Sequence, residues 1–306
     1  MTLLLGVLEE GLIYGVMALG VYITYKILDF PDLSVDSTFP MGAALTASAL
    51  MSGIHPAATL LLSFGAGALA GCATGFIHVK LKVRDLLSGI IVMTGLYSLN
   101  LRFAGGRANV PVFTQDTIFE NQFLADHIPQ WLSSYTMALI LFLIIAVCKV
   151  LLDLYLNTRS GYLLRAVGDN ESLVTSLAKD KGMVKILGLA IANGFSALAG
   201  SIYCQHKGFF EISVGTGTIV IGLASVIIGI QLLCPENGTS FLNSLKLPQV
   251  RPTTAVIAGS VVYKACISLA ISLGMEANDL KLITSILFLV ILVVSTERRK
   301  KVKSHA

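Results

Sequence analysis

Three carboxylates lie close together in the segment DFPDLSVDS, residues 29–37, which long apolar runs flank on both sides. They are Asp29, Asp32 and Asp36, with Ser34 between the last two. Carboxylates amid such runs are too costly to face hydrocarbon, so they are expected to face a cavity, a cation or water. Backbone that leaves a helix at membrane depth also needs protein or water around it. The segment therefore predicts a pathway lining, or a plain loop with turn and helix-cap residues.

One cation lies inside another apolar run. Lys264 is in the middle of AVIAGSVVYKACISLAISL, residues 255–273, far from either end. Such a lysine is expected to pair with one of the three aspartates or with Glu211, or to extend its side chain to the membrane boundary.

The first polar segment has a counterpart later in the chain, FFEISVGTG, residues 209–217. A shift of 179 positions places Ser34 on Ser213, and Glu211 falls where Asp32 stood. Seven residues between 15 and 35 are then identical: Gly15, Ala18, Leu19, Ile23, Phe30, Ser34 and Val35. Five expected spans separate the copies, so the copies would cross the membrane in opposite directions. Inverted repeats of this kind are typical of transporters, whose pathway lies between the halves.

The elements that position these residues are long apolar helices. The chain has 306 residues, of which 55% are hydrophobic and only 13% charged, and its mean hydropathy is +0.79. Runs of this length and composition indicate membrane-spanning helices. We expect an all-α polytopic membrane protein with about eight or nine spans and an inverted internal repeat. The expected spans are 11–28, 38–54, 57–79, 85–104, 135–156, 184–205, 217–234, 254–273 and 281–296.

The whole chain, 1–306, is expected to be one transmembrane domain. Its repeat halves would cover about 11–157 and 184–296, joined by a cytoplasmic loop at 158–183. Lys and Arg favour cytoplasmic loops, and they gather near 80–84, 159–185 and 298–303. This distribution predicts a cytoplasmic C-terminus and an outward loop at 105–134. Glu9 and Glu10 argue against a cleavable leader.

The loop at 158–183 contains a short amphipathic pattern. Asn170 is expected to cap a helix and Glu171 to lie in its first turn. Leu173, Val174, Leu177 and Ala178 would share one face at helical spacing. Such a helix suits a groove on a soluble partner, or it lies on the bilayer surface.

Several kinds of chemistry find no matching pattern. The sequence contains no P-loop, no HExxH, no GxSxG and no clustered His and Cys residues. We therefore expect no catalytic residues, no metal and no cofactor bound by this chain. The net charge of +4 follows from the basic loops and needs no nucleic-acid partner, although the basic tail could contact membrane lipid.

The order of three stretches resembles a known family. They are GLIYGVMALGVYITYKILDFPDLSVDSTFPMGAA, TRSGYLLRAVGDN and ANGFSALAGSIY. Together they resemble the permease subunits of bacterial ABC importers in the branched-chain amino acid and ribose permease superfamily. The stretches LDFPDLSVDSTFPMGAA and RAVGDN are most similar to those of permeases proposed to import tryptophan or tyrosine. The resemblance covers nearly the whole chain.

The resemblance implies partners and a location. It implies a cell inner-membrane protein, a second permease subunit in a homodimer or heterodimer, two cytosolic ATPase subunits that use ATP, and an external solute-binding protein. It also implies that Asn170–Ala178 is the coupling helix seated on the ATPase.

Three functions follow from the sequence. The first is an ABC permease that imports a small solute, such as an amino acid, with the pathway lined by the polar residues of the two segments and Lys264. The second is an ion-coupled secondary transporter that uses the Asp and Lys residues as a relay. The third is an intramembrane enzyme, which the missing nucleophile and metal patterns disfavour.

Overall fold

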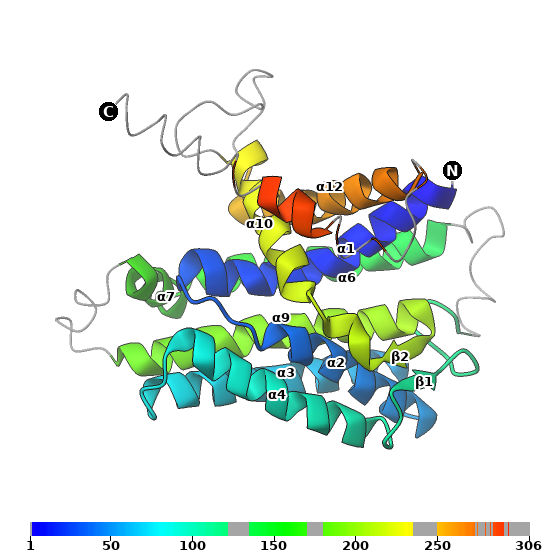
Figure 1. The fold of residues 1–306 in the computed structure, drawn as a ribbon, viewed down its shortest axis with the longest axis horizontal. Helices are drawn as coiled ribbons and strands as arrows, with labels where there is room; N and C mark the ends of the chain where they lie inside the picture. Colours follow the sequence, from blue (N-terminus) through cyan, green and yellow to red (C-terminus); the bar gives the residue numbers. More distant parts are fainter. Residues whose placement is uncertain are drawn as a thin grey trace.

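The structure is a computed structural model that describes residues 2–121, 135–169, 180–234 and 250–272, together with residues 274, 279, 282, 284–290 and 293. In these parts the chain forms a bundle of long helices with one small two-stranded sheet (Figure 1). The expected all-α polytopic architecture is confirmed.

The described elements follow one another along the chain. The long helices are α1 (Thr2–Tyr22), α2 (Val35–Met51), α3 (Pro56–Val79), α4 (Asp85–Phe103), α6 (Thr136–Leu156), α9 (Lys181–Lys207), α10 (Thr218–Leu233) and α12 (Pro252–Ser272). A π-helical turn, Ile23–Ile27, extends α1, and a 3-10 turn, Ile212–Gly215, precedes α10. The remaining elements are α7 (Arg159–Asp169) and the strands β1 (Asn109–Pro111) and β2 (Phe209–Glu211).

Seven helical segments in the described part are long and apolar enough to cross a membrane. The count is lower than the expected eight or nine for two reasons. Helix α2 has 17 residues, which is just short of the 18 that such a segment requires. The last expected span, 281–296, lies largely outside the described residues.

Helices α1 and α9 form the centre of the bundle. They run in opposite directions in Figure 1, and they are the most buried of the candidate spans, at 67% and 78% of their apolar windows. The largest core cluster draws many of its side chains from these two helices, including Met17, Leu19, Leu189 and Ile202. The other helices pack around this antiparallel pair.

A stripe of glycines brings α3 against α9. A side chain on Gly67 or Gly71 would collide with the carbonyl oxygen of Asn193 or Leu189, and one on Gly75 would meet Ile186. Small residues at four-residue spacing let two helix backbones approach closely in a membrane. The stripe therefore packs two helices of the same chain.

The short sheet ties two distant segments together. Strand β1, which follows α4, pairs antiparallel with β2, which follows α9, and Val110 lies opposite Phe210. The sheet fixes the start of the second polar segment beside the connection that follows α4.

Candidate translocation site

Each polar segment lies between two consecutive long helices, and in both cases it follows one of the two central helices, α1 or α9. The first, residues 28–34, lies between the extended α1 and α2; the second, residues 208–217, lies between α9 and α10. In Figure 1 the first turns of α2 and α10 lie near each other in the middle of the bundle. The two interruptions therefore meet in space, although 179 residues separate them in sequence.

Asp36 joins the two interruptions. It lies in the first turn of α2, and its carboxylate accepts hydrogen bonds from the start of α10. The donors are the backbone N–H of Gly217 at 3.1 Å, the hydroxyl of Thr218 at 3.0 Å and the backbone N–H of Ile219 at 2.8 Å. The first N–H groups of a helix have no partner within it, and a negative charge there is stabilised by the helix dipole. Asp36 thus caps α10 from another element.

Glycine and proline make this close approach possible. Gly217 precedes α10 with φ +86°, a left-handed conformation that glycine adopts readily. A side chain on Gly215 would collide with the carbonyl oxygen of Asp36 and with the ring of Pro40. Pro40 has no N–H for that carbonyl, which a residue four positions later in a helix would normally bond.

Asp32 and Ser34 belong to a different, fully buried network on α9. The Asp32 carboxylate accepts a hydrogen bond from the Ser34 N–H at 2.9 Å and another from the Asn193 side-chain amide at 2.7 Å. The hydroxyls of Ser34 and Thr38 donate to the side-chain amide oxygen of Asn193, Oδ1, at 3.1 and 2.8 Å. Burial raises the pKa of the Asp32 carboxyl, while the hydrogen bonds from Ser34 and Asn193 act to lower it. This network holds the first interruption against the central helix.

The other expected site residues lie apart from these contacts. Asp29 is exposed and has φ +51°. Glu211 is the last residue of β2, opposite Asn109, and it accepts a hydrogen bond from the exposed Ser213. Of the candidate residues, the structure brings Asp32, Ser34 and Asp36 to the junction of helices, and it leaves Asp29 outside.

The partner expected for Lys264 was wrong. Its ammonium bonds Glu10 Oε2 at 3.2 Å, whereas the prediction named the three aspartates or Glu211. Lys207, at the end of α9, bonds the other oxygen, Oε1, at 2.5 Å. One carboxylate on α1 therefore carries two ammonium groups from α9 and α12.

Aromatic rings lie against this charge cluster. The Lys264 ammonium is 4.0 Å from the centroid of the Tyr14 ring. On the aromatic side, Tyr14 is stacked on Phe39 with centroids 5.7 Å apart, and Tyr203 meets both rings edge-on. Sequence reasoning missed Glu10 as the partner, although an ionisable residue within an apolar run was a usable signal.

The expected coupling residues, Asn170 to Ala178, lie outside the described residues, so their prediction stays a prediction. The described part ends at α7 before them and resumes at Asp180, which caps α9 by accepting a hydrogen bond from the Gly182 N–H at 2.9 Å.

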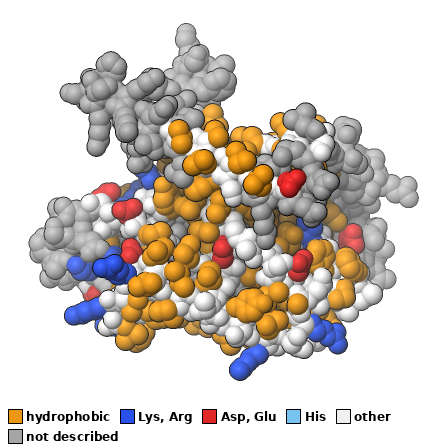
Figure 2. Space-filling model, viewed as in Figure 1, with side chains coloured by type: hydrophobic (Ala, Val, Ile, Leu, Met, Phe, Trp, Pro, Cys, Tyr) orange, Lys and Arg blue, Asp and Glu red, His pale blue; other side chains and the backbone are white. Residues whose placement is uncertain are grey.

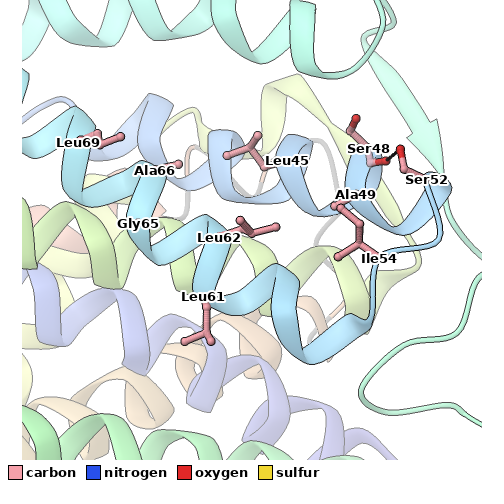
Figure 3. Close-up of a pocket in the computed structure, with 10 residues that line it drawn as sticks. All are labelled: Leu45, Ser48, Ala49, Ser52, Ile54, Leu61, Leu62, Gly65, Ala66 and Leu69. Carbon is pink, nitrogen blue, oxygen red and sulfur yellow. Dashed lines mark hydrogen bonds between the residues drawn. The ribbon is translucent and has the colours of Figure 1, made fainter.

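A groove between α2 and α3 is lined mostly by apolar side chains, unlike the polar contacts around Asp36 and Glu10. Figure 3 shows leucines such as Leu45, Leu61 and Leu69 along it, with Ser48 and Ser52 at one end. The Ser52 hydroxyl donates to the Ser48 carbonyl oxygen at 2.9 Å. None of the described residues that line this groove is charged, so these residues offer no charge to neutralise a charged solute.

Comparisons with known proteins agree with this architecture. The family described as branched-chain amino acid transport system / permease component matches residues 3–296. The tyrosine transport system permease protein of Clostridioides difficile (strain R20291) is 42% identical over 306 residues, which is 100% of this chain and 96% of the relative.

Two further relatives are more distant. An uncharacterized protein of Rickettsia prowazekii (strain Madrid E) is 32% identical, covering 95% of this chain and 96% of the relative. The ribose import permease of Escherichia coli (strain K12) is 23% identical, covering 74% and 68%. No solved structure matches the chain.

Proposed function

Since the chain belongs to the branched-chain amino acid transport permease family and is thus a multi-pass ABC importer subunit for a small solute, we propose that this solute is an aromatic amino acid. The relative named as a tyrosine transport permease supports this choice, because it is similar along the entire chain. An external solute-binding protein would deliver the amino acid.

The observation that carries the proposal is the junction of the two interrupted helices at Asp36. Transporters built from inverted repeats bind solutes near the middle of the membrane, at the interface between the repeats where interrupted helices meet. Figure 2 shows hydrophobic side chains over much of the face in view, with acidic side chains set among them. Carboxylates in an apolar face cannot be left against lipid, and a second copy of the chain, in a homodimer, would cover them.

The family implies an ATPase partner. The charge at one end of the helical bundle is consistent with an ATPase bound at that end. The α3–α4 turn and the start of α9 line one shared cavity, in which the basic residues outnumber the acidic ones: Lys82, Arg84, Lys181 and Lys185 against Asp85 and Asp180. Basic residues at one end of a bundle favour the cytoplasm. We place this end, the coupling segment and the C-terminus there. ATP would be hydrolysed by the partner, and this chain would have no enzymatic role.

Reconstitution tests the function. Proteoliposomes containing the permease, its ATPase and its binding protein are expected to accumulate labelled tyrosine only when ATP is supplied on the ATPase side. Leucine and ribose serve as comparison solutes, and permease without ATPase serves as the control. Tyrosine uptake driven by a proton or sodium gradient without the ATPase would contradict the proposal and favour a secondary transporter.

A further inference from the structure

We propose, on the premise of the proposed function, that Glu10, Lys264 and Tyr203 form a binding site for a free aromatic amino acid at the end of the bundle where α9 finishes. Glu10 would take the ammonium group of the solute, Lys264 its carboxylate, and Tyr203 its ring. This site is separate from the junction at Asp36.

The charges of the cluster complement those of a zwitterion. Glu10 holds Lys207 on one oxygen and Lys264 on the other, at 2.5 and 3.2 Å. An incoming ammonium can replace one lysine on Glu10, and the released lysine can bind the incoming carboxylate. The number of ion pairs is then preserved or increased, so no charge is left buried without a partner, which would be costly.

The charged side chains of the cluster are partly exposed. The Glu10 and Lys207 side chains are 32% and 30% exposed, and that of Lys264 is 13% exposed. Glu10 and Lys264 both lie inside candidate membrane spans. Partly exposed charges at such positions are expected to line a water-filled space, because facing lipid is expensive.

The aromatic residues provide the second half of the recognition. The Lys264 ammonium over the Tyr14 ring shows that this ring accepts a cation on its face. Tyr14 and Phe39 are buried, whereas Tyr203 is only partly buried and lies at the edge of the group. An aromatic solute held at Glu10 and Lys264 would reach Tyr203 and pack against it, edge-on or offset.

A side-chain-to-backbone hydrogen bond and a close contact fix α1 and α12 in register. The Ser260 hydroxyl, one turn before Lys264, donates to the Gly11 carbonyl oxygen at 2.7 Å. A side chain on Gly11 would collide with Val261. Because α1 and α12 are held this closely, Glu10 and Lys264 present their charges at a fixed separation to a solute.

The test measures analogue selectivity in the full-length permease assembled with its ATPase in lipid nanodiscs. Binding of labelled tyrosine is measured with tyramine, which lacks the carboxylate, and deaminotyrosine, which lacks the ammonium, as competitors. We expect wild-type protein to prefer tyrosine over each analogue by roughly tenfold or more, the value of one charge-assisted hydrogen bond. Lys264→Met should abolish the preference over tyramine only, and Glu10→Gln should abolish the preference over deaminotyrosine only.

Two further variants keep the result interpretable. Tyr203→Leu leaves the ion pairs in place and should weaken tyrosine binding by roughly tenfold, the loss of an aromatic contact and its buried area. Lys149→Met is the matched control, since Lys149 also lies in a candidate span and pairs with a carboxylate, that of Asp153 at 3.0 Å. It should leave all three affinities unchanged.

The outcomes separate this site from the function it rests on. If wild-type protein transports tyrosine but the variants fold and lose all ligands equally, or lose nothing, the cluster is a structural ion-pair network and the site is refuted. If Glu10→Gln does not fold, unchanged tyrosine affinity in Tyr203→Leu refutes the site. If wild-type protein neither binds nor transports any amino acid, the proposed function itself fails.

Discussion

Three aspartates of one short segment have three different environments. Asp29 is exposed, Asp32 is 1% exposed and hydrogen-bonded to Asn193, and Asp36 is half-buried against the start of α10. The same side chain therefore lies at the surface of a loop in one case, bonds a neighbouring helix in the second and caps a helix in the third. Asp32 connects the first interruption to α9, and Asp36 connects α2 to the start of α10.

Replacing Asp36 should weaken the junction. Asp36→Asn keeps one acceptor oxygen but removes the charge at the start of α10, and it is expected to lower the free energy of unfolding by about 1 kcal/mol. Asp36→Ala, which leaves the donors of α10 without partners, is expected to cost about 1–3 kcal/mol. Thermal unfolding in detergent measures the stability, and tyrosine uptake in proteoliposomes measures the function.

The matched control for this prediction is Asp29→Asn, because Asp29 belongs to the same segment and is exposed. It should unfold and transport as the wild-type protein does. A double-mutant cycle between Asp36→Asn and Thr218→Val should show coupling of about 0.5–3 kcal/mol, as expected for residues in contact. Strictly additive effects would contradict the capping role.

The candidate site could be predicted from the sequence only in part. The first polar segment could be located because carboxylates within apolar runs stand out in the sequence. The second could be located because it repeats the first after 179 positions. The partners could not be found in this way. Glu10 and Lys264 are 254 residues apart, and Asp36 and Ile219 are 183 apart. Their contacts depend on how helices pack, and no local pattern encodes that packing.

At the scale of elements, close backbone contact decides how the helices assemble. Gly71 of α3 faces Leu189 of α9, and Gly42 of α2 faces Ala197 of the same helix, each with no room for a methyl group. Both α2 and α3 therefore depend on glycine to approach α9. The four-residue spacing of glycines along α3 is a sequence signal for close helix packing, but the spacing alone does not identify the partner helix.

A pair of alanine substitutions on α3 should separate packing from helix propensity. Gly71→Ala forces α3 away from α9 and is expected to lower the free energy of unfolding by about 1–3 kcal/mol. Gly65→Ala has open space around it and is expected to raise stability by about 0.5–1 kcal/mol, because alanine favours a helix. Fluorescence-detected thermal unfolding compares the two; equal effects would mean that α3 does not rest on α9 through Gly71.

At the scale of the molecule, the number of membrane crossings and the positions of the basic residues should give the same orientation in the membrane. Helices α1, α2, α3 and α4 followed by α6 make five passes before the basic connection to α9, so α1 and α9 run in opposite directions, as Figure 1 shows. The apolar runs allowed most of these spans to be predicted with boundaries within three residues, but the start of α1 was missed by nine, because Glu9 and Glu10 lie inside the helix. The start of α2 was missed by three residues, because Asp36 and Pro40 lie inside its first turns.

This arrangement makes a prediction about sidedness. If the basic end at the α3–α4 turn is cytoplasmic, the connection after β1 must lie on the outer face, since α4 alone separates them. A cysteine at the exposed Thr114 should then react with a membrane-impermeant maleimide in intact cells, and one at the exposed Lys80 should react only after the cells are opened. The background for both variants lacks the five native cysteines. Labelling of Lys80→Cys in intact cells, with none of Thr114→Cys, would show that the orientation is the opposite of the one predicted. It would also place the Glu10 cluster on the cytoplasmic side, where it could not meet a solute arriving from outside.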